Sequence, residues 1–316
     1  MKQENSQEKE ADKMFKKGKD ALTTGVFQWK KDYNLGAMQF EEAAKLYKEC
    51  KNFKKEKEAL KFAIECNEKL NDTWAVGRNY EALLNSLIDN SSDDYKELVE
   101  WTQKAGVYFK VSDSGMKSLQ VLNKVAKYLN KRQQFELSEK IILEALTEAE
   151  ELQAPSTRTD IICSYVEILI ETQQYHKVAD LYMKEITKFR EEHMKYPLSQ
   201  YALIIIVMYI LQDEIIRANQ ELEQLIIQVY NFHKSSEFRA VDQMLNSYEK
   251  GDQNQFNDAV MKACVTSIYP PNIVRALRKV KVRVINIHSK QNINQQQLDQ
   301  GNEENDYQQE LEKKIL

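Results

Sequence analysis

The sequence predicts an all-α protein: a tetratricopeptide-like right-handed solenoid of antiparallel helix pairs, closed by a C-terminal helical cap. The 316 residues include only 8 Gly and 4 Pro, too few turn-formers for a β-sandwich, propeller or barrel. A polar turn followed by a large apolar residue also recurs every 40 to 42 residues, the length of two helices and two short turns. The recurring apolar residues are Phe53, Tyr95, Phe135, Tyr175, Ile215 and Phe256.

The individual elements follow from the apolar pattern between these positions. Apolar residues recur there at the i, i+3, i+4, i+7 spacing of amphipathic helices. Pro155, Pro197 and Pro271 each stand where a first helix should begin, because proline is tolerated in a first turn. Gly251 is expected to end a helix. The expected helix pairs lie at 34–69, 72–109, 113–152, 155–191, 195–229 and 234–265, with a leading helix at 6–22 and a closing helix at 271–285.

Composition divides the chain into a helical repeat domain over 1–285 and a tail over 286–316. The tail is rich in Gln, Asn and acids, so we predict that it is disordered. The four cysteines form no C-x-x-C pair and the N-terminus has no secretory pattern, which predicts reduced thiols and a cytoplasmic location. The longest apolar run, Tyr201 to Leu211, would span about 16 Å as a helix, so we expect a buried helix.

The sequence contains no recognisable catalytic constellation. Its four histidines are at least 17 residues apart, too far for a metal-binding pair on one helix turn. No glycine-rich phosphate loop is present, and adjacent acids on a helix point about 100° apart. The net charge of −4 argues against a nucleic-acid binder. We therefore expect no catalytic residue, cofactor or metal, and a binding module is favoured over an enzyme.

Two stretches resemble a known family. The segment Thr24–Tyr33 has the form T-G-φ-φ-x-W-K-x-D-Y, and Phe40–Tyr47 and Cys50–Phe53 continue it. It resembles the N-terminal part of the soluble NSF attachment protein (SNAP) family, closest to the gamma type. Val121–Tyr128 is similar to the L-x-K-V-A-x-Y helix of that family.

The resemblance implies an adaptor in vesicle-mediated intracellular protein transport. Such an adaptor wraps a syntaxin-type SNARE four-helix bundle and recruits the hexameric ATPase NSF, which takes the bundle apart. Its N-terminal loop touches the membrane, so the chain would be peripherally associated with membranes. The runner-up is a generic tetratricopeptide-like scaffold for another partner.

The membrane contact implied by the resemblance falls on an apolar and basic loop. Val26, Phe27 and Trp29 can enter the lipid headgroup zone while Lys30 and Lys31 meet anionic lipid. The alternative is that these side chains pack onto neighbouring helices. An exposed loop would favour the adaptor, whereas buried Phe27 and Trp29 would favour the scaffold.

The partner contacts implied by the resemblance fall on basic side chains. To bind an acidic SNARE bundle, the adaptor needs basic side chains on the face lined by the first helix of each pair. The alternative for each such side chain is that it is only solvated. The candidates are Arg78, Lys117, Lys124, Lys127, Arg158 and Arg239. For NSF, the resemblance points to the closing segment in an acid-free stretch over 259–290, for which nonspecific anion binding is the alternative. The candidates there are Leu277, Arg278, Lys279 and Lys281.

Overall fold

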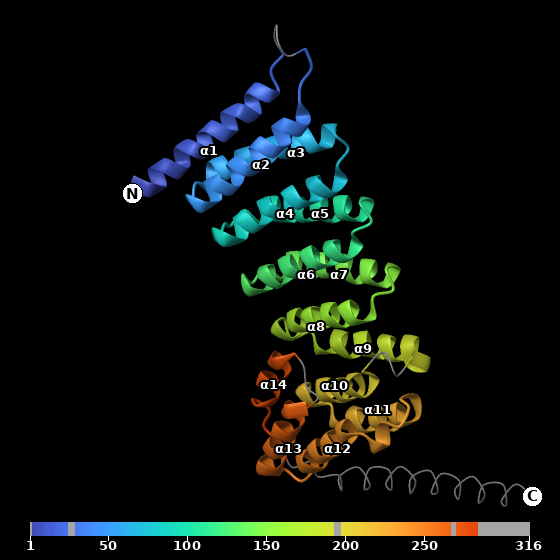
Figure 1. The fold of residues 1–316 in the computed structure, drawn as a ribbon. Coiled ribbons are helices and arrows are strands. Elements are labelled where there is room, and N and C mark those ends of the chain that lie inside the picture. The colour runs from blue at the N-terminus through green and yellow to red at the C-terminus, as the bar shows by residue number, and fades with distance from the viewer. Residues whose placement is uncertain (1, 25–28, 193–196, 267–269, 284–316) are drawn as a thin grey trace, which may run out of the picture. The chain divides into compact units, whose positions relative to one another are not determined.

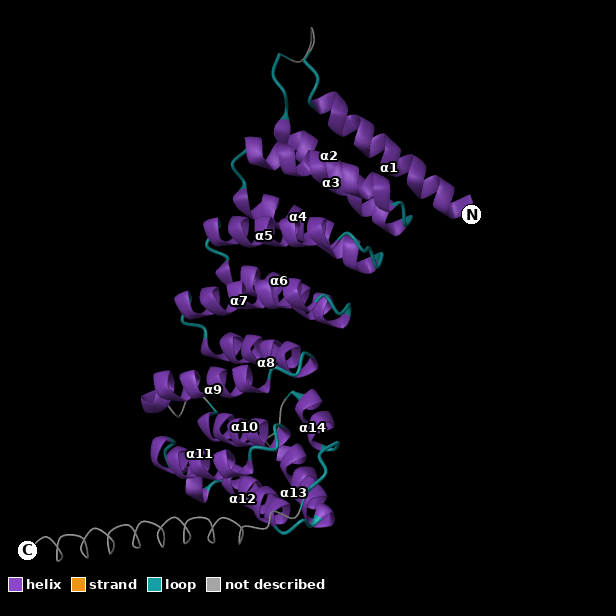
Figure 2. Cartoon of the chain, turned by 180° about the vertical axis from the view of Figure 1, so that it is seen from behind, coloured by secondary structure: helices purple, strands orange, loops and turns teal. Residues whose placement is uncertain are grey.

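The computed structural model describes residues 2–24, 29–192, 197–266 and 270–283. Over these ranges the chain is helical and contains no strand (Figure 2). This confirms the all-α, paired-helix class that the turn-former count and the 40-residue period predict. The chain divides into two compact units, Met1–Gln174 (unit 1) and Tyr175–Leu316 (unit 2). The predicted single repeat domain over 1–285 stays a prediction.

Unit 1 is a stack of antiparallel helices (Figure 1). Each helix from α1 to α7 packs against the one that follows it, and α6 also contacts α8. Seven consecutive helices, α2 to α8, have 17 residues each, about 25 Å of rise. The helices are α1 (Lys2–Ala21), α2 (Tyr33–Glu49), α3 (Phe53–Lys69), α4 (Thr73–Asp89), α5 (Tyr95–Val111), α6 (Gly115–Lys131), α7 (Phe135–Glu151) and α8 (Pro155–Glu171).

Unit 2 is built around one apolar helix. Helix α10 contacts α9, α11, α12 and α14, and its residues from Tyr201 to Ile210 are all buried. This packing explains the long apolar run. No described helix combines the length and apolarity needed to cross a membrane. The helices are α9 (Tyr175–Phe189), α10 (Leu198–Leu211), α11 (Ile215–Gln228), α12 (Ser236–Glu249), α13 (Gln253–Thr266) and α14 (Pro271–Leu277), with 3-10 turns at Arg190–Glu192 and Phe232–Lys234.

The turn between α2 and α3 shows how a short connection between helices is built. After α2, Lys51 adopts a positive φ of 57°, and the Asn52 N–H donates to the Tyr47 carbonyl at 2.9 Å. This is the Schellman ending, which satisfies a free carbonyl of the last helical turn. The Asn52 side chain then accepts from the Lys55 N–H and caps α3. One residue thus ends a helix and starts the next, which keeps the turn to three residues.

The predicted helix boundaries agree closely with the structure, with one clear error. Five of the six recurring apolar residues are the first residues of α3, α5, α7, α9 and α11, and the sixth, Phe256, lies within the first turn of α13. Gly251 follows α12 with φ at 69°, as a helix-ending glycine should. The closing helix was expected to reach residue 285, but α14 ends at Leu277.

The early end of α14 has a tertiary cause. The Gln253 side chain donates to the Val280 carbonyl at 3.2 Å and accepts from the Val282 N–H at 3.0 Å. These contacts hold residues 280–282 away from a helical path, which the alternating β-branched valines also disfavour. The predicted disordered tail, 286–316, lies outside the described residues.

Candidate functional site

The outer side of the first helices in unit 1 forms the surface on which the sequence places the SNARE contacts. We call the exposed side of α2, α4, α6 and α8 the first-helix face. Neighbouring helices on it are joined by polar side chains about one repeat apart. Arg78 on α4 pairs with Glu41 on α2. From α6, Lys117 pairs with Glu81 at 2.9 Å, and the Lys124 ammonium donates to Asn85 at 2.7 Å.

Glu41 fixes the position of Arg78. One oxygen of the Glu41 carboxylate accepts from Asn67 at 3.1 Å and from Asn79 at 2.9 Å, while the other binds the Arg78 guanidinium. The guanidinium also lies 5.1 Å from the centre of the Trp74 ring. Arg78 is therefore held in place yet remains 46% exposed. It borders an open groove of about 510 Å³ between α2 and α4.

Helix α6 is the positive part of this face. Its charged residues are Lys117, Lys124, Lys127 and Lys131, without a single acid. Lys124 binds only the neutral amide of Asn85. Lys127 is exposed and forms no ion pair with any described residue. Apart from Lys117, which pairs with Glu81, the lysines of α6 therefore have no ion-pair partner among the described residues.

The six predicted SNARE-contact residues are not equivalent. Arg78, Lys117, Lys124 and Lys127 lie together on the adjacent helices α4 and α6. Arg158 on α8 is 8% exposed and donates at 3.3 Å to the Leu146 carbonyl and to Glu150. Its guanidinium therefore serves the packing of α7 on α8.

The sixth predicted contact, Arg239, belongs to unit 2. It is exposed on α12. The assignment of all six as SNARE contacts stays a prediction.

The loop after α1 presents an exposed aromatic side chain. Trp29 is 88% exposed, and Lys30 and Lys31 are exposed beside it. The Asp32 N–H donates to the Ala21 carbonyl at 2.9 Å, which brings the two ends of the loop together. Exposure of Trp29 agrees with the loop expected of an adaptor. It does not agree with the alternative that Trp29 packs onto neighbouring helices. Val26 and Phe27 lie outside the described residues.

The segment after α13 carries the predicted NSF contacts. We call residues 275–283 the basic strap. Arg278, Lys279 and Lys281 are exposed on it, and Arg283 lies 3.5 Å from Asp213. Leu277, by contrast, is completely buried. It anchors the strap to unit 2, so only the three cations offer an accessible contact.

The remaining chemistry of the described residues shows no reactive centre. Burial raises the pKa of Cys66 to about 11 and that of Cys163 to about 12, so neither thiol is ionised at neutral pH. No three His, Cys, Asp or Glu side chains in the described ranges form a metal-binding group.

Three residues that shape these surfaces were missed by sequence reasoning: Glu41, Trp74 and Gln253. Glu41 bonds to residues 26 to 38 positions away. Gln253 bonds to residues 27 and 29 positions away. Trp74 meets Arg78 one turn along α4, a spacing that the sequence does contain. Of the three residues, only Trp74 could have been found from the sequence, because its spacing to Arg78 places both side chains on one face of a helix.

Comparison with known proteins agrees with this architecture. A family model described as "Soluble NSF attachment protein, SNAP" matches residues 2–267. The gamma-soluble NSF attachment protein of Dictyostelium discoideum is 21% identical over 253 residues, which cover 77% of this chain and 74% of the relative. The resemblance predicted from Thr24–Tyr33, including its likeness to the gamma type, is confirmed.

Proposed function

Because the chain belongs to the soluble NSF attachment protein family, we propose that it is an adaptor that binds assembled SNARE bundles and recruits NSF to disassemble them. The adaptor makes and breaks no covalent bond. It links the bundle to the ATPase, which supplies the energy. The observation that carries the proposal is the family match over 2–267, in a chain whose first-helix face is basic at α6.

The SNARE contact is proposed for the basic part of the first-helix face. Lys124 and Lys127 lie on α6, which has no acids, and Arg78 is fixed by Glu41 and Trp74 without being buried. A fixed guanidinium loses less side-chain entropy when it binds a carboxylate. Cations on a rigid face steer an acidic partner and set its orientation.

The NSF contact is proposed for the basic strap. Buried Leu277 and the Gln253 amide hold the strap against unit 2. The cations of Arg278, Lys279 and Lys281 are thereby presented from a fixed backbone.

The membrane contact is proposed for the loop around Trp29. An exposed indole with adjacent lysines suits the headgroup zone of an anionic bilayer. Two lysines contribute about 2 kcal/mol near such a surface, whereas even millimolar affinity requires about 4 kcal/mol. A single loop therefore binds weakly, and several adaptors on one bundle would have to act together.

The test is ATP-dependent disassembly of a purified syntaxin-type SNARE bundle by NSF, with and without this protein, at low and moderate salt. We expect disassembly to require the protein and to weaken as salt rises. A Trp29→Ser variant should be impaired only when the SNAREs are in liposomes. Absence of binding to the bundle at low salt would contradict the adaptor function and leave the generic helical scaffold.

A further inference from the structure

Helix α1 is nearly neutral in sequence, but its charges are separated in the fold. Two of its acids, Glu8 and Asp12, point toward α3, where both contact the Lys55 ammonium, at 3.1 and 2.8 Å. Asp12 also accepts from the Tyr47 hydroxyl at 2.7 Å. These contacts hold the pKa of Asp12 below its usual value, chiefly through the hydrogen bond from Lys55. The acids are thus engaged on the inner side of the helix.

The opposite side of α1 carries lysines. Ala11 and Gly18 are buried and mark the inner side. Lys13, Lys16 and Lys17, at the i, i+3, i+4 spacing of one helix face, are exposed and form no ion pair with a described residue. We call these three residues the lysine ridge.

Exposed acids border the lysine ridge and reduce its charge only in part. Lys9 lies one turn before the ridge and adds a fourth exposed cation. Glu10 lies at the flank of the ridge, and Asp20 follows it at the end of α1. The outward side of the helix therefore keeps a positive balance.

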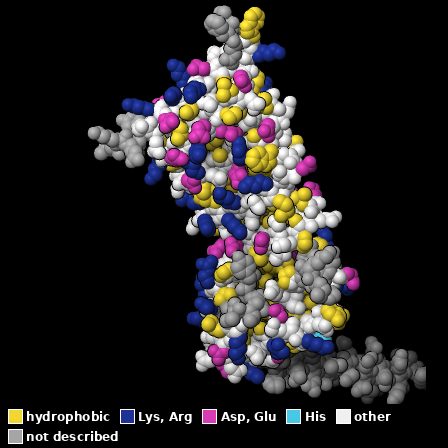
Figure 3. All heavy atoms as spheres, in the orientation of Figure 1, with side chains coloured by type: hydrophobic (Ala, Val, Ile, Leu, Met, Phe, Trp, Pro, Cys, Tyr) yellow, Lys and Arg dark blue, Asp and Glu magenta, His cyan; other side chains and the backbone are white. Residues whose placement is uncertain are grey.

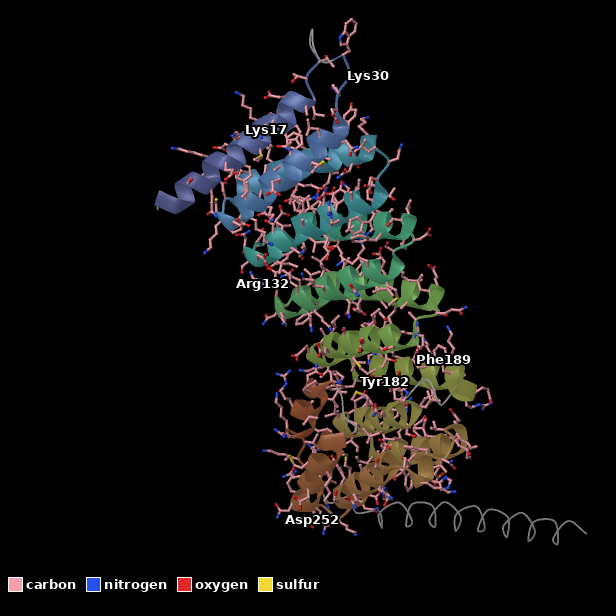
Figure 4. All side chains as sticks on the ribbon, viewed as in Figure 1. Lys17, Lys30, Arg132, Tyr182, Phe189 and Asp252 are labelled. Carbon is pink, nitrogen blue, oxygen red and sulfur yellow. The ribbon has the colours of Figure 1, made fainter. Side chains whose placement is uncertain are left out.

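The lysine ridge and the exposed tryptophan belong to the same end of unit 1. Lys17 is four residues before Ala21, about 6 Å along the helix, and Ala21 is bonded to Asp32. Trp29 precedes Asp32 by three residues, at most about 11 Å of chain. Figure 4 shows Lys17 and Lys30 toward this end. Figure 3 shows Lys and Arg side chains over this part of unit 1, with acidic side chains among them.

We propose that the lysine ridge of α1 is an anionic-lipid binding surface, which lies on the headgroups while Trp29 enters them. The inference deepens the proposed function, because it rests on the membrane contact at the loop. An anionic bilayer supplies both chemistries that this end of unit 1 presents: a negative layer for the lysines and an apolar boundary for the indole. An acidic protein would match the lysines alone.

The experiment measures partition of the full chain onto two kinds of vesicle, phosphatidylcholine alone and phosphatidylcholine with 30% phosphatidylserine. The ridge variant is Lys13→Gln, Lys16→Gln, Lys17→Gln. The matched control is Lys54→Gln, Lys96→Gln, Lys140→Gln, three exposed lysines on second helices of unit 1, with the same change in charge. Thermal unfolding monitored by circular dichroism checks that both triples remain folded.

On the anionic vesicles, the ridge variant should bind about a hundredfold more weakly than the wild type, since each lysine near the surface contributes about fivefold. The control triple should lose far less affinity for the anionic vesicles. On neutral vesicles the two triples should bind alike, whereas Trp29→Ser should bind more weakly to both kinds of vesicle. Moderate salt should shrink the effect of the ridge variant.

Equal losses in the two triples on anionic vesicles would overturn the proposal, as would a wild type that does not bind them at all. A ridge variant that binds a detergent-solubilised SNARE bundle weakly but vesicles normally would also overturn it and assign the surface to a protein. Disassembly of that solubilised bundle by NSF is measured in parallel. It tests the adaptor function separately, because no membrane is present.

Discussion

At the scale of single residues, the turns use side chains that the left-handed conformation ordinarily disfavours. Of the ten described residues with positive φ, nine are not glycine. They recur after successive helices, as at Lys51, Asn71 and Ser91. For those that are not Asn or Asp, this conformation costs about 1 kcal/mol relative to glycine, and the Schellman bonds and the cap of the next helix offset that cost.

This strain predicts opposite effects of two substitutions. Gly251→Ala should lower the free energy of unfolding by about 1 kcal/mol, because it places a Cβ in the left-handed region. Gln133→Gly, at φ 59°, should raise it by about 0.5 kcal/mol, since relief of strain exceeds the added freedom of the unfolded chain. Urea unfolding measures both. Gln134→Gly, at φ −89°, is the control and should destabilise the protein. A destabilised Gln133→Gly variant would contradict the account.

Glu148 is a buried acid whose negative charge is poorly balanced by neighbouring groups. It is 3% exposed on α7, and its nearest cation, Lys110, lies 3.5 Å away. Neither carboxylate oxygen accepts a hydrogen bond of normal geometry from a described residue. Burial therefore raises the pKa of Glu148. Because the folded protein holds this proton more tightly than the unfolded chain, stability falls as pH rises through the interval between the ordinary and the raised pKa.

Glu148→Gln should remove this loss. The variant should be more stable than the wild type near neutral pH, by about 1 kcal/mol, and the gap should close as pH falls toward 4. Thermal unfolding across pH measures the effect. Glu151→Gln, an exposed position on the same helix, should show no such pH dependence. A Glu148→Gln variant that is less stable than the wild type at pH 7 would mean that the Lys110 ion pair outweighs burial.

At the scale of elements, the basic strap depends on one side chain of a neighbouring helix. Gln253 on α13 supplies the partner for both the Val280 carbonyl and the Val282 N–H. These backbone groups lie beyond the end of α14, where no helical partner is available. The part of the strap beyond α14 therefore depends on the Gln253 amide for these two backbone bonds, whereas buried Leu277 anchors its start.

Gln253→Ala should release the strap without unfolding unit 2. Hydrogen exchange at the Val282 amide should accelerate at least tenfold, because its acceptor is lost. Stimulation of NSF should fall severalfold, since the cations of the strap would no longer share a fixed backbone. Gln255→Ala, at an exposed position on the same helix, is the control. Unchanged exchange at Val282 would show that the Gln253 bonds do not hold the strap.

At the scale of the whole molecule, the net charge of the chain is −4, yet two of its local surfaces are positively charged. Helix α6 contains lysines without acids, and α1 keeps the three lysines of the lysine ridge exposed. Fields of this kind act over about 8 Å at physiological salt. Partner choice is therefore decided by each surface rather than by the net charge.

Charge reversal on α6 tests this at the level of the complex. Lys124→Glu, Lys127→Glu should weaken binding to a SNARE bundle by at least tenfold at low salt and by less at high salt. The unfolding free energy should change little, because Lys124 binds only a neutral amide. Lys54→Glu, Lys140→Glu is the matched control. Equal weakening by the two pairs, in a titration of the bundle, would remove α6 from the interface.

The sequence by itself determined the fold class, nearly all helix boundaries and the family. These depend on local signals: the apolar period, the polar turns, and the motif Thr24–Tyr33. Local signals left open whether Trp29 is exposed or packed against neighbouring helices, and the structure shows it exposed. Local reasoning failed at the end of α14, where the decisive partner, Gln253, lies 27 residues away.

The tertiary structure decided which charges remain available. Arg158 is used in packing and Leu277 is buried, although both resembled surface contacts in the sequence. Two acids of α1, Glu8 and Asp12, are engaged by Lys55, and this contact leaves the lysine ridge with a positive balance. Helical periodicity predicts on which side of its helix a residue lies. Whether its charge is neutralised depends on a partner from a distant helix, and only folding brings that partner within ion-pair distance.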